Sequence, residues 1–126
     1  MTAAVVLSEQ DMQELAEFYA KARHVPAARV CVLDLDPQAH ASLHLGLTVI
    51  DGGNSMYEIL CGDGTIAESQ RWVAENLAVV PANLDLAAAE LELAGEVGRE
   101  VILRDQIQAV DADAFDYMIL DCPPSL

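Results

Sequence analysis

Three aspartates follow two apolar segments of the sequence, and a proline comes soon after each group. Val30–Leu33 is an uninterrupted apolar run followed by Asp34 and Asp36, and Tyr117–Leu120 is followed by Asp121. Short apolar runs of this kind are typical of strands covered on both faces. An unpaired carboxylate inside such a strand would cost on the order of several kcal/mol. We therefore expect the three acids at the carboxyl ends of two strands.

Carboxylates in that position can do specific chemistry. In an open α/β sheet, ligands bind beyond the carboxyl ends of the strands. Aspartates there can hold magnesium directly or through water, and one of them can orient the water that attacks a phosphoryl group. The alternative is that the acids only cap loops or the start of a neighbouring helix. Their spacing alone does not separate these two interpretations.

Four apolar segments separated by helical patterns must position these acids. The expected strands are Ala3–Leu7, a strand starting at Arg29, Leu77–Val80 and Tyr117–Leu120. The expected helices are 8–23, 39–45, 55–61, a short piece at 65–68, a helix starting at Asn83 or Leu84, and 99–110. Capping-box patterns mark the helices at Ser55 and Thr65, and Gly95 and Gly98 separate the last two. This alternation predicts an α/β fold with about four strands, mostly parallel, and flanking helices.

Composition limits the possible partners. The 126 residues carry 21 acids and 6 bases, a formal net charge of −15, and 53% of them are hydrophobic. Such a chain can form a core but repels phosphate backbones, so DNA binding by this chain alone is not expected. No apolar run has membrane-spanning length and no signal pattern opens the sequence, which favours a cytoplasmic protein without a membrane contact.

The remaining candidates for chemistry are weaker. Three widely spaced cysteines, Cys31, Cys61 and Cys122, favour reduced buried thiols. His40 and His44 are four residues apart and could hold zinc, but without a third ligand exposed loop histidines are the simpler interpretation. Trp72 is expected at an apolar helical position, packed in the core.

Several ordered motifs resemble the ParA/Soj partition ATPases of the ParA/MinD group of P-loop ATPases. Asp34-Leu35-Asp36-Pro37-Gln38 with Ser42 and Leu45-Gly46 is similar to the first switch region, and Ser55–Leu60 to the helix that follows it. The central stretch of the family is matched by 76–93, and its Walker B strand and second switch by 115–126. The resemblance covers about residues 29–126 and implies a P-loop NTPase-like doubly wound sheet. It also implies that 1–126 is a single incomplete domain of this kind.

The resemblance implies roles for the acids. Asp36 would be catalytic, assisting water attack and lying near magnesium, and Asp121 would support magnesium through water. Asp34 would contact the ligands of the metal rather than the metal itself. ATP and Mg²⁺ would be the cofactors, and ATP-dependent self-dimerisation and a ParB-type partner would drive plasmid or chromosome segregation.

One departure from the family pattern is severe. The family carries a Lys-Gly-Gly-x-Gly-Lys-Thr loop after its first strand, where backbone donors and lysines bind phosphates. The corresponding interval, Glu9–Leu15, has no glycine or lysine, and Glu9 and Asp11 add negative charge there. We therefore expect impaired nucleotide binding and little or no ATPase activity. The alternatives are a non-catalytic module that binds a ParA-like or other protein, or an acidic domain of unrelated binding function.

Overall fold

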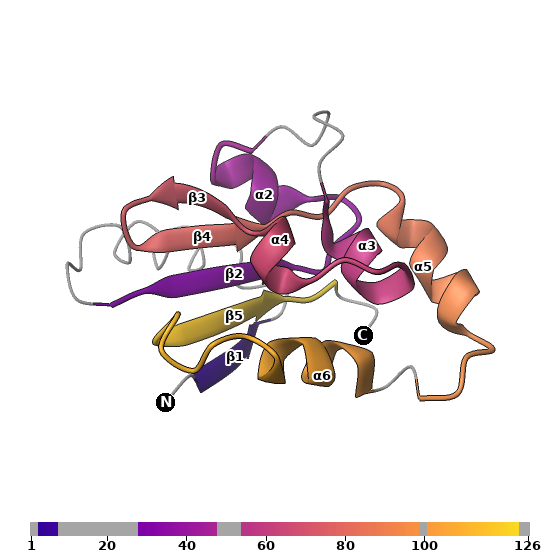
Figure 1. Ribbon diagram of the computed structural model, residues 1–126. Helices are drawn as coiled ribbons and strands as arrows, with labels where there is room; N and C mark the ends of the chain where they lie inside the picture. Colours follow the sequence, from indigo (N-terminus) through magenta and orange to yellow (C-terminus); the bar gives the residue numbers. More distant parts are fainter. Residues whose placement is uncertain (1–2, 8–27, 48–53, 99–100, 124–126) are drawn as a thin grey trace.

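The computed structural model describes residues 3–7, 28–47, 54–98 and 101–123, with the backbone alone for 3–7. These residues form a five-stranded sheet in the order β1-β5-β2-β4-β3, with helices on both of its faces (Figure 1). The helix expected at 8–23 lies outside the described residues. None of the described helices is long and apolar enough to cross a membrane.

All four expected strands are present and run parallel. They are β1 (Ala3–Leu7), β2 (Val30–Asp34), β4 (Leu77–Val80) and β5 (Tyr117–Asp121). Every described side chain of β2 and β4 is buried, as expected for strands covered on both faces. This result confirms the prediction of a mostly parallel α/β sheet.

A fifth strand, β3 (Arg71–Ala74), pairs antiparallel with β4 at the sheet edge and was not predicted. It contains Trp72, so the helical position expected for this residue is wrong. The expected core position is wrong as well, because Trp72 is 52% exposed. Its indole stacks on the buried ring of Phe115, with ring centroids 5.6 Å apart. The strand was missed because four residues next to a turn carry too little periodicity to separate strand from helix.

The described helices lie near their expected positions. Their bounds are α2 (His40–His44), α3 (Met56–Cys61), α4 (Ile66–Ser69), α5 (Leu86–Leu93) and α6 (Ile102–Gln108). Ser55 forms the expected capping box with Glu58 at the start of α3, and the Thr65 side chain caps α4. His40 and His44 lie on α2 rather than in a loop.

The core is divided between the two faces of the sheet. Cys31 and Leu33 of β2 belong to a cluster that packs under α3, α4, α5 and α6. Val30 and Val32 alternate with them and belong to a cluster on the opposite face, which includes residues of α2. Burial raises the pKa of the Cys31 thiol to about 12, so this cysteine stays protonated and inert at neutral pH.

Candidate functional site

Asp34 and Asp121 end two neighbouring strands at the same level. In the β2–β5 ladder their Cα atoms are register partners, and β1 pairs Leu7 with Asp121 on the other side. Strand β5 lies between β1 and β2, so Asp121 lies between the ends of both strands. The backbone N–H of Leu35 donates to the carbonyl of Asp121 at 2.9 Å. This bond extends the pairing of the two chain segments by one residue beyond Asp34.

The two carboxylates also share a face of the sheet. Side chains alternate along a strand, so Asp34 follows Val30 and Val32, and Asp121 follows Ile119. These three apolar residues belong to the cluster on the α2 face. The acids therefore project to the face that carries α2, at the carboxyl edge of the sheet.

The Asp34 carboxylate is buried and fully engaged. One oxygen accepts hydrogen bonds from the Ser42 backbone N–H at 2.9 Å and from the Ser42 hydroxyl at 2.6 Å, and the other accepts the N–H of Asp36 at 3.1 Å. Burial raises the pKa of Asp34 above its ordinary value, although the bonds from Ser42 and Asp36 oppose the shift. With both oxygens used, Asp34 is suited to positioning its neighbours rather than to binding a metal directly.

Asp36 is held by a tight turn after β2. Its carbonyl accepts the N–H of Ala39 at 2.8 Å, and its carboxylate accepts the N–H of Gln38 at 3.0 Å. Ala39 has φ 57°, a left-handed conformation that costs a residue with a Cβ about 1–2 kcal/mol. Asp36 itself is buried. The turn therefore keeps its carboxylate inside the protein, next to the carboxyl end of β2.

Ser42 connects three segments at this edge, which the sequence did not reveal. Besides donating to Asp34, its hydroxyl accepts the buried backbone N–H of Ala82, in the loop between β4 and α5, at 3.2 Å. The sequence signals for this residue are its place eight residues after a strand-end acid and its membership of the motif that resembles the first switch region, and neither shows what its side chain contacts. The contact becomes visible only in the structure, where α2 brings Ser42 to Asp34 at the end of β2.

The donor chemistry of this edge fits magnesium in part. Asp36 and Asp121 supply carboxylate oxygens, which are the ligands that Mg²⁺ prefers, and Mg²⁺ commonly uses one or two carboxylates and takes its other ligands from water and phosphates. Among the described residues, no three or more His, Cys, Asp and Glu side chains converge as a preformed metal site. The interval that follows β1 lies outside the described residues, and its sequence from Glu9 to Leu15 has no glycine or lysine.

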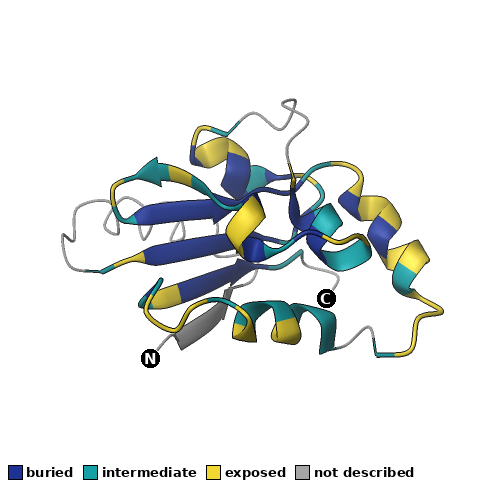
Figure 2. Ribbon diagram, viewed as in Figure 1, coloured by how far each residue is buried: buried dark blue, intermediate teal, exposed yellow. Residues whose placement is uncertain are grey.

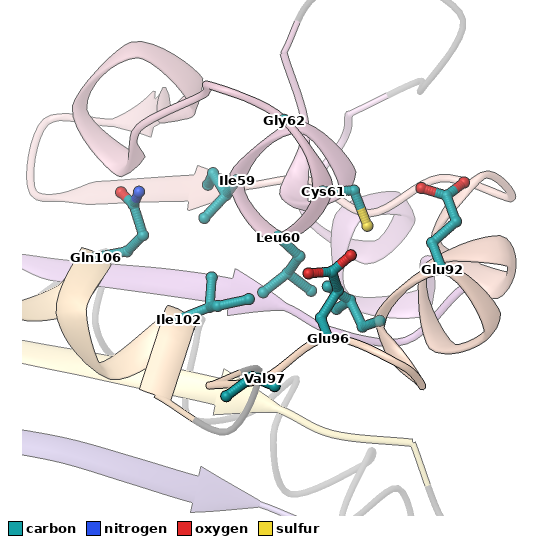
Figure 3. Close-up of a pocket in the computed structure, with 10 residues that line it drawn as sticks. Ile59, Leu60, Cys61, Gly62, Glu92, Glu96, Val97, Ile102 and Gln106 are labelled. Atoms are coloured by element: carbon teal, nitrogen blue, oxygen red, sulfur yellow. The ribbon is translucent and has the colours of Figure 1, made fainter.

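A separate groove of about 480 Å³ lies between α3, α5 and α6 (Figure 3). Its lining combines apolar side chains, such as Leu60, Leu93 and Ile102, with the carboxylates of Glu92 and Glu96. The described residues that line it include no lysine or arginine. This groove is on the face opposite to Asp34 and Asp121, and its charge does not suit a phosphate.

Comparison with known families matches residues 13–126 to the family described as "AAA domain". Among curated relatives, the sporulation initiation inhibitor protein Soj of Bacillus subtilis is 41% identical over 99 residues, which are 78% of this chain and 39% of Soj. The chromosome partitioning protein ParA of Caulobacter vibrioides is 34% identical over 100 residues, 78% of this chain and 38% of ParA. The chain thus matches about two fifths of the length of these relatives.

Solved structures agree with this match. A cobyrinic acid a,c-diamide synthase from Mycobacterium smegmatis, with a bound ATP analog and magnesium, superposes with a TM-score of 0.86 at 31% identity, covering 98% of this chain and 52% of that one. An ATP complex of a McdA variant from Cyanothece gives 0.83 at 26% identity, covering 98% and 48%. Both bind nucleotide, and the similarity extends over the whole sheet.

Proposed function

The chain belongs to the AAA domain family, in the ParA/Soj line of partition ATPases, and from this membership we propose that it carries the magnesium side of a partition ATPase site. The observation that supports the proposal is the in-register pair of Asp34 and Asp121 at the ends of adjacent parallel strands. Asp36 lies two residues further along the same edge. Three acids therefore gather at the place where this fold presents ligands.

We assign the three acids different tasks. Asp36 and Asp121 would contribute to holding Mg²⁺, with Asp121 acting through water, and the magnesium would supply positive charge to phosphate oxygens. Asp36 is the proposed catalytic residue, because the family resemblance gives it that role and the turn after β2 holds its buried carboxylate at this edge. Asp34 is a positioning residue, since its oxygens hold the backbone of Asp36 and both donors of Ser42.

The phosphate side of the site is the part that this chain does not match. Glu9 and Asp11 follow β1, whose last residue pairs with Asp121. With Glu14, the interval 9–15 carries three acids, and carboxylates in the interval that should bind phosphates oppose nucleotide binding through like-charge repulsion. We therefore propose that the chain binds Mg-ATP weakly and does not turn it over on its own. By resemblance to the family we also propose a ParB-type partner, self-dimerisation and a cytoplasmic location. The net charge of −15 opposes DNA binding by this chain.

Calorimetric titration of the 126-residue chain with Mg-ATP, paired with a phosphate-release assay, tests the proposal. We expect no saturable binding at micromolar nucleotide and no phosphate release above that of the Asp36→Ala variant. Micromolar affinity with turnover abolished by Asp36→Ala would contradict the loss of the phosphate side. Replacing residues 9–15 with Lys-Gly-Gly-Ala-Gly-Lys-Thr should raise the affinity, and the gain should disappear in the additional presence of Asp36→Ala or Asp121→Asn. A gain that survives both changes would refute the assigned roles.

A non-catalytic role remains the second candidate function, and it makes a different prediction. An interaction module would bind a full-length ParA-like protein in a pull-down regardless of nucleotide. It would also keep that binding when Asp36 and Asp121 are replaced. The acid substitutions therefore distinguish a residual magnesium site from a purely structural scaffold.

A further inference from the structure

Helix α5 carries apolar side chains on two opposite sides. Leu86 and Ala89 are buried in the core beneath it. Counting the turn that precedes the helix, four exposed apolar residues recur on the other side at i, i+3, i+4 and i+7 spacing. This outer stripe consists of Leu84, Ala87, Ala88 and Leu91.

The two leucines of the outer stripe are largely exposed to solvent. Leu84 and Leu91 are 74% and 83% exposed, and Figure 2 shows α5 with buried and exposed residues along its length. An amphipathic surface helix normally directs polar side chains to solvent, and a helix apolar on both sides is normally covered on both. In the part of the chain that the structure describes, α5 is covered only on its inner side.

Carboxylates border the outer stripe on both sides. At about 100° per residue, Asp85 and Glu92 lie along one edge of the stripe and Glu90 lies along the other, and all three residues are exposed. The Tyr57 hydroxyl donates to Glu92 at 2.8 Å, which ties that carboxylate to α3. The sequence has no lysine or arginine between Arg71 and Arg99, so no nearby base of this stretch neutralises the acids.

We propose that the outer stripe docks a basic amphipathic helix of a partner protein. Such a helix would bury Leu84 and Leu91 under its apolar side, by helix–helix packing, and place lysine or arginine against Asp85, Glu90 and Glu92. A second copy of this chain fits poorly, because the net charge of −15 and the bordering acids would repel each other. The proposal is independent of the nucleotide site, which lies on the other face of the sheet.

A defined probe tests this surface. The probe is a fluorescein-labelled synthetic helical peptide of 18 residues, with leucines on one side and lysines on the other, and its binding to the 126-residue chain is followed by anisotropy. Replacing both large residues, Leu84→Ser with Leu91→Ser, should weaken binding at least tenfold, which corresponds to about 1.4 kcal/mol. The matched control is Leu43→Ser, an exposed leucine on α2, which should leave the affinity unchanged. Circular dichroism verifies that every variant is folded.

A second pair of variants tests the contribution of the acids that border the outer stripe. Asp85→Asn with Glu90→Gln should weaken binding and reduce its salt dependence, whereas Glu68→Gln with Glu75→Gln, exposed acids outside α5, should not. Equal losses in both pairs would mean general attraction to an acidic protein and would overturn the proposal. Analytical ultracentrifugation tests whether a second copy of this chain occupies the stripe instead. A dimer that Leu84→Ser with Leu91→Ser dissociates would make the stripe a self-interface and would also overturn it.

Discussion

The hydroxyl of Ser42 lies 2.6 Å from a carboxylate oxygen of Asp34, although eight residues separate them in the chain. The bond closes the segment between β2 and α2 into a loop, and the same hydroxyl accepts the N–H of Ala82. One buried side chain thus aligns a strand end, a helix and the loop before α5. The proposed positioning of Asp36 depends on this arrangement.

Ser42→Ala should therefore destabilise the protein. The change removes one donor to a buried carboxylate and leaves the buried Ala82 N–H without its acceptor, and each such loss costs about 1–3 kcal/mol. Urea denaturation followed by circular dichroism measures the effect. Ser69→Ala is the matched control, because the buried Ser69 hydroxyl has no hydrogen-bond partner among the described residues. A control as damaging as Ser42→Ala would mean that buried volume, not hydrogen bonding, sets the loss.

Asp34→Asn should change how stability depends on pH. Burial raises the pKa of Asp34 in the folded protein above its ordinary value of 3.8, so the folded state holds this proton more tightly than the unfolded chain. Its contribution to stability is complete below pH 3.8 and is lost as the pH rises through the raised folded pKa. The free energy of unfolding of the wild type minus that of the variant should fall over this window. A difference that rises with pH would show that the folded pKa is lowered instead.

Asp36→Asn and Asp121→Asn should each weaken divalent cation binding. Mn²⁺ replaces Mg²⁺ as a probe, because its free concentration is measured directly by electron paramagnetic resonance. We expect weak binding by the wild type, since water and phosphate normally complete such a site, and a further loss in each variant. Asp111→Asn removes one exposed charge elsewhere and corrects for general attraction to the acidic chain. Equal loss in all three variants would exclude a defined site at the sheet edge.

Ser55→Ala should destabilise the protein more than Thr65→Ala. Both side chains cap a helix, and losing one cap costs about 0.5–2 kcal/mol. The Ser55 hydroxyl additionally accepts the Asn83 side chain at 3.2 Å, which joins α3 to the loop before α5. The Thr65 side chain accepts only the Glu68 N–H among the bonds that the structure gives it. Thermal unfolding of the two variants provides the comparison, and equal losses would mean that the Asn83 contact adds nothing.

Phe115→Ala should destabilise the protein by about 3–5 kcal/mol, the usual cost of truncating a buried phenylalanine. Its stacking partner Trp72 is 52% exposed, so Trp72→Ala should cost clearly less. The single tryptophan also reports its own exposure, and we expect acrylamide to quench its fluorescence in the folded protein. A shielded tryptophan with a blue-shifted emission would contradict the edge position of β3.

The sequence by itself determined the parallel strands, the capped helices and the family. Apolar runs, caps and glycines act through neighbours in the chain, so their physical effect can be read locally, and the ordered motifs from Asp34 to Cys122 carry the lineage. The tertiary structure decided which residues meet. It placed β5 between β1 and β2, so that Asp121 pairs with Asp34, and it brought Ser42 onto both Asp34 and Ala82.

The edge strand β3 and the exposed stripe on α5 also required the structure. Trp72 looked like a core residue because its size favours burial, but an edge strand leaves one side of such a ring in solvent. Leu84 and Leu91 recur at helical spacing, as core residues do. A sequence shows that one side of a helix is apolar, but it does not show whether another segment covers that side. Burial depends on contacts between distant segments, and only the assembled sheet and helices establish those contacts.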